Sequence, residues 1–549
     1  MGVFLIGCAF LPVVGCSGTR SEAPKEKQQG HTEATNYEQG HSGASASEGE
    51  ARCDRTRTVI RHGYTTNDLP ACPNKGGLLL GTDKSDQQKG NKGGFSGSTP
   101  PDAGALSDKP NIVFILADDL DKASTQKIGR LRKYIGNKGV TFQNAFVSDP
   151  VCCPSRATIL RGQYPHNHLV RSNEPPLGGF QTFHNLGREK STVATWLDRK
   201  AGYCTAFVGS KYLNHYDDTE RTYVPPGWDE WYALNNRGTI NRNGRIHEYP
   251  ADTYRDDLLS GIARDFIRRM KGKDRPFFLQ LSLQAPHEPS TPAPRYEDWF
   301  QGEQAPRTPS FNEQDVSDKP PWIRNRPPLS SEAILRIDKD YRDRLRTMAA
   351  VGEMAGKLVR ALKDANKLNN TYIVFASDNG YHLGQHRLGF GKNYPYEEDI
   401  RIPLMIRGPG IPAGITRSDM VLNNDFAPTF ASWAGVTPPA FVDGRSFVSL
   451  IDGNPQTTPS SWRTAFEVRY WQEKGGGGVP SYQAVRTRQY LYVEYETGAR
   501  ELYDLKADPY QLQNIYTSAD PALIAELQSR LHELRTCSGD GCRVAEDGL

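Results

Sequence analysis

Residues 109–120, Lys-Pro-Asn-Ile-Val-Phe-Ile-Leu-Ala-Asp-Asp-Leu, decide the fold. Residues 112–117 form a continuous apolar run, which is the pattern of a strand buried on both faces of a parallel sheet. Asp118 and Asp119 follow at the C-terminal end of this run, and open α/β sheets place their ligands at that edge. The stretch therefore predicts a central strand that leads into a functional site.

Four more apolar runs predict further buried strands, and segments with helical periodicity separate them. One helix is expected at residues 345–362, where apolar side chains recur every three or four positions. Because strands and helices alternate, we expect an α/β protein with a large, mainly parallel sheet flanked by helices. The strand candidates are residues 203–209, 276–284, 372–377 and 403–407.

A second pair of polar residues follows a predicted strand. Asp378 and Asn379 come directly after residues 372–377, as Asp118 and Asp119 follow the first strand. Together they would supply hard oxygen ligands from two strand ends, which suits Ca²⁺ or Mg²⁺ better than a metal bound by thiolates. Each pair taken alone could equally be an ordinary polar strand end.

Two adjacent cysteines open a predicted helix within residues 149–168, Asp-Pro-Val-Cys-Cys-Pro-Ser-Arg-Ala-Thr-Ile-Leu-Arg-Gly-Gln-Tyr-Pro-His-Asn-His. Pro154 suits the first turn of a helix, and Gly162 is a natural helix stop. A group at Cys152 would face the positive end of the helix dipole, where an anion is favoured by roughly 0.3–1 kcal/mol. The residues alone leave a second interpretation open, namely a buried cysteine pair or half of a disulfide beside a short helix.

Residues 152–162, Cys-Cys-Pro-Ser-Arg-Ala-Thr-Ile-Leu-Arg-Gly, resemble the signature of type I sulfatases, Cys-x-Pro-Ser-Arg followed by Leu-Thr-Gly. The resemblance implies that a maturase oxidises the first cysteine of the motif to formylglycine (3-oxoalanine), which is the nucleophile once hydrated. It puts Cys152 in that role and makes Cys153 the variable residue. One departure is Arg161, where the family usually has Thr.

The same resemblance implies a metal site and an anion-binding site. Asp118, Asp119, Asp378 and Asn379 match the sulfatase metal ligands, and the oxygen of the modified Cys152 would complete the site around Ca²⁺ in preference to Mg²⁺. Lysines and a histidine in three further loops match the family's sulfate-binding and catalytic positions, and an arginine of the motif would help to offset sulfuryl charge. These residues are Lys211, Lys392, His287 as proton donor, and Arg156. The group that deprotonates the nucleophile stays open between His215 and His382.

Among sulfatases, the motifs resemble the N-acetylglucosamine-6-sulfatase branch. This implies hydrolysis of a sulfated sugar, such as a 6-sulfated N-acetylglucosamine unit. A simple aryl sulfate is the alternative substrate. His166, Asn167 and His168 could hydrogen-bond the sugar hydroxyls, or could merely cap the helix and hold the loop. Two other functions stay open: a phosphonate or phosphate ester hydrolase on the same fold, and a non-catalytic lipoprotein that binds sulfated polymers.

The N-terminal part of the chain has a different composition. Residues 1–16 form a short apolar segment that ends in small residues, which is typical of a secretory signal. Its last four residues, Val-Val-Gly-Cys, resemble a bacterial lipobox and imply a cell-envelope lipoprotein anchored at Cys16, with simple secretion as the alternative. Residues 17–108 are rich in Ser, Gly, Glu, Lys and Gln and are predicted to form a disordered tether. Within it, Cys53 and Cys72 could close a local disulfide.

The charge balance argues against a nucleic-acid partner, because 67 basic and 64 acidic residues leave a net charge of only +3. Beyond the N-terminus, no apolar run is long enough to span a membrane. Membrane contact is therefore expected only through a lipid at Cys16.

Several helix and strand breakers at residues 438–459 predict a domain boundary. The catalytic α/β domain would cover residues 109–440, and a smaller C-terminal α+β subdomain would cover residues 441–549. In that subdomain, alternating runs within residues 481–505 predict antiparallel strands, and a last helix is expected at 521–535. The two cysteines after this helix could form a small disulfide loop; they are Cys537 and Cys542.

Overall fold

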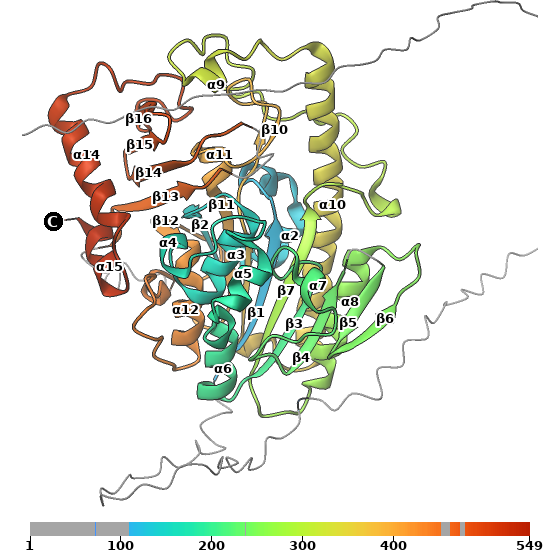
Figure 1. Cartoon of the computed structure of the whole chain (residues 1–549). Coiled ribbons are helices and arrows are strands. Elements are labelled where there is room, and N and C mark those ends of the chain that lie inside the picture. Colours follow the sequence, from blue (N-terminus) through green and yellow to red (C-terminus); the bar gives the residue numbers. More distant parts are fainter. Residues whose placement is uncertain (1–71, 73–108, 236–237, 452–461, 473–477, 549) are drawn as a thin grey trace, which may run out of the picture. The chain divides into compact units, whose positions relative to one another are not determined.

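The main sheet has ten strands, with helices on both of its faces (Figure 1). The computed structural model describes Cys72 and residues 109–548, except residues 236–237, 452–461 and 473–477. The spatial order of the strands is β12 (Ile415–Leu422), β2 (Val140–Phe146), β11 (Arg401–Arg407), β8 (Thr371–Ser377), β1 (Asn111–Asp118), β7 (Phe277–Pro286), β3 (Cys204–Gly209), β4 (Glu230–Leu234), β5 (Thr239–Arg242) and β6 (Arg245–Glu248).

The centre of the sheet is parallel, as predicted. β1 pairs in parallel with β7 and β8, and β3 pairs in parallel with β7 and β4. β11 instead runs antiparallel to β8 and β2, although its sequence was compatible with a parallel strand. The reason is the connection from β8, because the intervening residues 378–400 contain one α-helix, the four-residue α11 (Glu397–Ile400). The chain therefore returns from the same edge without the long crossover that a parallel pair requires.

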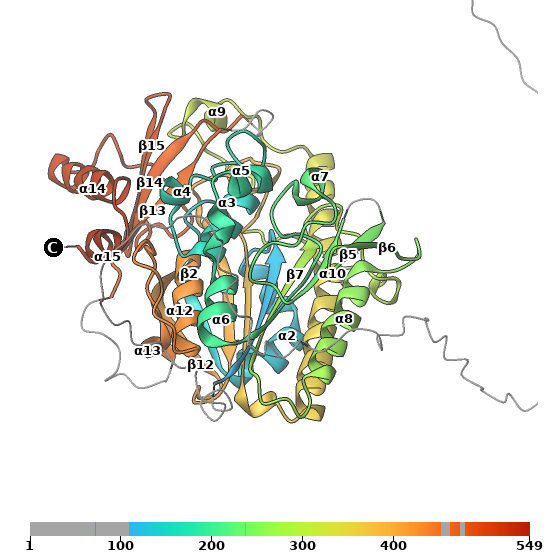
Figure 2. The ribbon, with the colours of Figure 1, turned by 60° about the horizontal axis from the view of Figure 1, so that its bottom comes forward.

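Two hydrophobic cores lie on the two faces of β1. Different helices cover these two faces (Figure 2). Every second residue of β1 packs with α3 (Cys152–Arg161), α6 (Val193–Ala201) and α12 (Phe426–Trp433). The residues between them pack with α2 (Gly129–Tyr134), α8 (Arg255–Arg269) and α10 (Ser331–Asp364). Burial on both faces explains the continuous apolar run, and α10 confirms the helix predicted at residues 345–362.

The four other predicted strands are present as β3, β7, β8 and β11, with small shifts of their ends. Five strands were not predicted: β2 and β12 at one end of the sheet, and β4, β5 and β6 at the other. In β2, β5, β6 and β12 no apolar run has the expected length, and β6 is largely exposed. β4 carries a run of four apolar residues at 231–234, which was a usable signal. Shorter elements occupy the loops: α4 (Pro165–His168), α5 (Gly179–Asn185), α7 (Tyr216–Thr219), α9 (Pro321–Arg324), α13 (Val448–Ile451), and the pair β9 (His382–Leu383) and β10 (Phe390–Gly391).

The C-terminal part contains the predicted antiparallel sheet, which has four strands: β13 (Ala465–Tyr470), β14 (Tyr482–Thr487), β15 (Tyr490–Tyr495) and β16 (Arg500–Asp504). The predicted last helix is α14 (Pro521–Leu534), whose apolar side chains pack on this sheet. The Cys537–Cys542 disulfide is confirmed. The helix α15 (Asp540–Asp547) was not predicted, and the boundary at residue 440 stays a prediction.

Cys72 forms a disulfide with Cys204, so the predicted pairing of Cys72 with Cys53 is wrong. Cys204 is buried at the start of β3, and 132 positions separate the two partners, so no local pattern marks the pair. The predicted signal segment with Cys16, and the tether apart from Cys72, lie outside the described residues. In the described part of the chain, no helix combines the length and the apolar character needed to cross a bilayer.

Candidate active site

Cys152 is the first residue of α3, a helix that is buried along its whole length. Pro154 lies in its first turn, and Gly162 ends it with a φ of 67°, in the left-handed region. Both features confirm the sequence interpretation. A Cβ at Gly162 would lie 2.9 Å from Val442 Cγ1, so both the backbone conformation and the packing favour glycine here.

We expect Gly162→Ala to lower the free energy of unfolding by about 2–4 kcal/mol, because it adds a strained φ and a steric clash in the core. Gly435 is a matched control, since it has a φ of 69° and no atom within 4 Å of an added Cβ. Gly435→Ala should lose only the backbone part, about 1 kcal/mol. Denaturant unfolding of both variants measures the difference. Equal losses would contradict the tight packing at the end of α3.

The four predicted metal ligands meet at one edge of the sheet. β1 and β8 are parallel neighbours, so the pair Asp118–Asp119 emerges beside the pair Asp378–Asn379. The backbone N–H of Asp119 donates to Asp378 Oδ1 at 3.0 Å, and Asn379 Nδ2 donates to Asp119 Oδ1 at 2.8 Å. All four side chains are buried, and Asn379 Oδ1 has no hydrogen-bond partner among the described residues.

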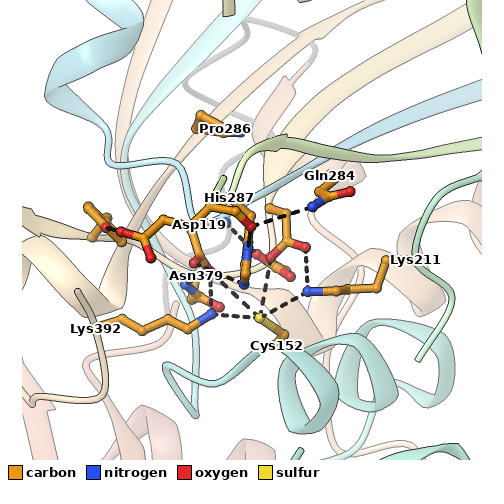
Figure 3. A network of polar contacts seen from close by, with 12 residues as sticks. Asp119, Cys152, Lys211, Gln284, Pro286, His287, Asn379 and Lys392 are labelled. Carbon is orange, nitrogen blue, oxygen red and sulfur yellow. Dashed lines mark hydrogen bonds and ion pairs between the residues drawn. The ribbon is translucent and has the colours of Figure 1, made fainter. Parts of the chain in front are cut away.

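Two lysines approach the Cys152 thiol from opposite sides (Figure 3). Lys392 Nζ lies 2.6 Å from Cys152 Sγ, and Lys211 Nζ lies 3.7 Å from it. Lys211 Nζ also lies 2.7 Å from Asp118 Oδ2, and Lys392 forms an ion pair with Asp119. The structure thus brings the predicted nucleophile, both predicted sulfate-binding lysines and two of the predicted metal ligands together.

Arg156 connects the carboxylates to the loop of Lys211. Its Nε donates to Asp378 Oδ2 at 2.7 Å. Its Nη1 donates to the backbone carbonyl of Lys211 at 2.7 Å and to Ser282 Oγ at 2.6 Å. The side chain is buried, so this arginine adds a positive charge to the site and also fixes the positions of Asp378 and Lys211.

His287 comes directly after β7 and is half-buried. Its Nδ1 lies 2.6 Å from the carbonyl oxygen of Glu288, so the neutral ring carries its proton on Nδ1. Its Nε2 lies 3.7 Å from Asp119 Oδ2, beside the carboxylate cluster. His287 can therefore accept a proton at Nε2 and, once protonated, donate it there.

The charges of the cluster set the pKa values of its members. Burial alone would raise the pKa of Asp118, but the charges of Lys211 and His287 outweigh it and hold the pKa well below its usual value. For Asp378, burial and the charge of Asp118 dominate and raise the pKa to about 6. Burial, with a contribution from Asp118, also raises the pKa of the Cys152 thiol well above its usual value. The unmodified thiol is therefore protonated at neutral pH.

A pocket of about 410 Å³ opens onto this cluster, and Asp119, His287 and Lys392 form part of its lining. His382 lines the same pocket, with its Nδ1 2.9 Å from Asp399 Oδ1. The remaining lining residues are Glu288, Arg326, Tyr381, Leu388, Gly389, Phe390, Gly391, Asn393 and Tyr394.

His215, the other candidate base, is not among the residues that line this pocket. Its ring nitrogens lie 2.8 Å from Glu174 and 2.7 Å from Asp218. The structure therefore brings His382 to the candidate site and leaves His215 in a separate group of charged side chains.

Of the two interpretations for His166, Asn167 and His168, the structure supports the second, in which these side chains hold the loop and do not bind sugar hydroxyls. His168 is fully buried, and all three side chains are hydrogen-bonded within the fold. The reason is their place in the chain: they follow the C-terminal end of α3, whereas Cys152 lies at its N-terminal end. Their partners are Thr158 for His168, Glu467 for His166, and Asp443 with the carbonyl of Cys537 for Asn167.

Ser282, which receives a hydrogen bond from Arg156, and several residues of the pocket were not predicted. Tyr381 and Asn393 adjoin motif residues, so their closeness to Asn379 and Lys392 was a usable signal. Arg326 lies in a stretch rich in proline and far from every motif, where nothing in the sequence marks it.

Oxygen ligands for a hard cation, beside basic side chains that converge on one group, are typical of enzymes that hydrolyse anionic esters. A family model described as sulfatase matches residues 110–436. A second, described as the C-terminal region of N-sulphoglucosamine sulphohydrolase, matches residues 384–537. The chain belongs to the sulfatase family, and it is a sulfuric ester hydrolase.

Individual proteins show the same relationship. The N-acetylglucosamine-6-sulfatase of Capra hircus is 36% identical over 485 residues, which cover 80% of this chain and 85% of the goat protein. A solved structure of a protein in complex with its substrate D-glucosamine-2-N,6-O-disulfate has a TM-score of 0.67 and 26% identity, and the match covers 77% of this chain and 97% of that one. A phosphonate monoester hydrolase from Silicibacter pomeroyi shares the fold, with a TM-score of 0.62, 22% identity, and coverage of 78% of this chain and 96% of that one.

Proposed function

We propose that this sulfatase removes sulfate from a sulfated sugar, with a 6-sulfated glucosamine unit as its substrate. The reaction would use a formylglycine at position 152 and a hard divalent cation beside it. The observation that carries the proposal is the position of Cys152, which is buried between Lys211 and Lys392 and next to the carboxylate cluster. The goat relative and the solved complex with a sulfated glucosamine support a sugar substrate.

Cys152 suits this role after modification better than as a thiol. A reactive cysteine needs a stabilised thiolate, whereas burial raises the pKa of this thiol. Oxidation by a maturase would replace the thiol with an aldehyde, whose hydrate offers one hydroxyl to attack sulfur and a second that lets sulfate leave. The neighbouring Cys153 lies in the hydrophobic core, and burial raises its pKa to about 12.

The residues present fit a hard divalent cation. The carboxylates and the Asn379 amide offer oxygen donors, and the buried Asn379 Oδ1 is an acceptor that a cation would satisfy. We assign Ca²⁺ because it accepts many oxygen ligands in flexible geometry, whereas Mg²⁺ usually retains several waters. When bound, the cation would polarise the reacting oxygen and offset negative charge. The proposed ligands are Asp118, Asp119, Asp378, Asn379 and the oxygen at position 152.

The remaining side chains have complementary tasks. Lys211 and Lys392 would bind the sulfate oxygens, because both ammonium groups lie beside the position of the nucleophile. Arg156 would hold Asp378 and the Lys211 loop in place. His287 would donate a proton from Nε2 to the leaving alcohol. His382, which lines the pocket, is the candidate for deprotonating the nucleophile.

We expect kcat/KM for N-acetylglucosamine 6-sulfate to exceed that for a simple aryl sulfate by about 10-fold or more. Polar side chains of the pocket, such as Tyr381 and Asn393, would hydrogen-bond sugar hydroxyls and would lose these partners with an aryl ring. Sulfate release from both substrates measures the ratio. Equal constants would defeat the sugar specificity and leave the membership of the sulfatase family intact.

One observation favours a second function, hydrolysis of phosphonate or phosphate esters, namely the fold shared with a phosphonate monoester hydrolase. A metal with two lysines would also bind a phosphoryl group. A phosphonate ester in the same assay decides between them, because a higher kcat/KM for it than for the sulfated sugar would favour the second function. A non-catalytic binding protein would instead show an intact Cys152 thiol and no turnover.

A further inference from the structure

We infer that the substrate carries a second anionic group, a sulfate or a carboxylate, and that Arg326 binds it; this inference rests on the proposed function. Arg326 lines the same pocket of about 410 Å³ as Asp119, His287 and Lys392. The lysines beside Cys152 are assigned to the sulfate that is removed. Arg326 is therefore an additional cation in the substrate pocket, outside the reaction cluster.

The hydrogen bonds that the structure gives to the Arg326 side chain go to uncharged groups. Its Nε donates to the carbonyl of Trp322 at 3.0 Å, and its Nη2 lies 3.4 Å from the hydroxyl of Tyr394. Among the residues that the structure describes, no carboxylate forms an ion pair with it. By contrast, Arg156 in the cluster is paired with Asp378 at 2.7 Å. An unpaired guanidinium at the wall of a substrate pocket is suited to an anionic group of the ligand.

Glu288 also lines the pocket outside the cluster, and its carboxylate does not neutralise Arg326. Glu288 Oε1 lies 3.4 Å from the hydroxyl of Tyr381. No ion pair joins Glu288 to Arg326 among the described residues. The charge of Arg326 is thus left for a ligand.

Several contacts fix the guanidinium before any ligand binds. Tyr394 is buried, its backbone N–H donates to Asp399 Oδ2 at 2.8 Å, and its ring packs edge-on against His382 at 5.3 Å. The backbone carbonyl of Arg326 accepts a hydrogen bond from Arg387 Nη1 at 3.0 Å. A guanidinium held in this way loses little conformational freedom when it binds an oxyanion through two parallel hydrogen bonds.

The size of the pocket limits where the second anion can be. The volume of about 410 Å³ suits a small ligand such as one sugar with its substituents. The second anion would therefore be a sulfate on the same sugar, or a carboxylate on a sugar linked to it. Both groups present oxygens that match the fork of an arginine.

The test measures kcat/KM of the wild type, Arg326→Ala and Arg326→Lys on three substrates. These are N-acetylglucosamine 6-sulfate, glucosamine-2-N,6-O-disulfate, and N-acetylglucosamine 6-sulfate linked to a uronic acid. We expect the wild type to prefer at least one doubly anionic substrate. Arg326→Ala should reduce that preference, as a ratio of kcat/KM values, by about 10–100-fold, mainly through KM, because a charge-assisted hydrogen bond is lost. Arg326→Lys should retain part of it, since lysine keeps the charge and lacks the fork.

Arg324→Ala is the matched control, because Arg324 is exposed, lies two positions earlier and does not line the pocket. It should leave the preference unchanged. A general structural defect lowers kcat/KM for all three substrates alike, so the ratio separates binding from folding. An unchanged ratio in Arg326→Ala, or a wild type that prefers the singly anionic sugar, would overturn this inference alone. A wild type that hydrolyses none of the three sugars would overturn the proposed function together with it.

Discussion

Cys152→Ala is expected to abolish sulfate release, with a loss of roughly 10⁴-fold or more. The side chain at this position lies between the two lysines and 3.2 Å from Asp118 Oδ1, where the proposed nucleophile would meet the bound sulfate. Alanine offers neither a thiol for the maturase nor a hydroxyl for attack. Initial rates of sulfate release from a 6-sulfated sugar measure the effect.

Cys152→Ser should behave differently from the alanine variant. Serine has a single hydroxyl, so it can accept sulfate once but has no second hydroxyl to expel it. We expect at most one sulfate bound per chain, visible as a mass increase, and no sustained turnover. Cys153→Ala is the matched control, because Cys153 is buried in the core and its backbone N–H donates to Asn173. Turnover by Cys152→Ala, or an equal loss in Cys153→Ala, would contradict the assignment.

Asp119→Ala should reduce kcat/KM by roughly 10³-fold or more, because the cation loses a ligand. Without a firmly bound cation, its positive charge no longer offsets the negative charge of the transition state. Asp119 is hydrogen-bonded to Asn379 and ion-paired with Lys392, so its loss also disturbs the positions of these groups. Exhaustive chelation of the wild type should cause a comparable loss. Added Ca²⁺ should restore the wild type and leave the variant inactive.

The control for this experiment is Asp121→Asn. Asp121 lies two positions after Asp119, and its Oδ1 accepts a hydrogen bond from the backbone N–H of Ser124 at 2.8 Å. It is not among the carboxylates that surround Cys152, so the variant should keep most of its activity and its dependence on Ca²⁺. Full activity of exhaustively chelated, metal-free protein would refute the metal assignment.

The centre of the fold is predictable because burial on both faces leaves a simple trace in the sequence. The apolar runs of β1 and β8 identify the central strands, and the acidic residues after each run mark the functional edge. The strands β5 and β6 have four residues each and β6 is largely exposed, so their residues carry no such pattern. The antiparallel direction of β11 depends on the path of the chain after β8, which composition does not encode.

Two partners could not be predicted from the sequence, because each lies far away along the chain. Cys72 pairs with Cys204, at a separation of 132 positions. Asn167 bonds to the carbonyl of Cys537, at a separation of 370 positions. Local patterns contain no information about such partners. The same holds for Arg326, which enters the pocket through the tertiary contact with Tyr394.

The mass of the peptide that contains position 152, taken from active protein, tests the central claim most directly. We predict that this peptide carries the aldehyde of formylglycine at Cys152 and an unmodified thiol at Cys153. Tandem mass spectrometry distinguishes the two adjacent positions. Active protein with an intact thiol at Cys152, or with the aldehyde at Cys153, would contradict the account.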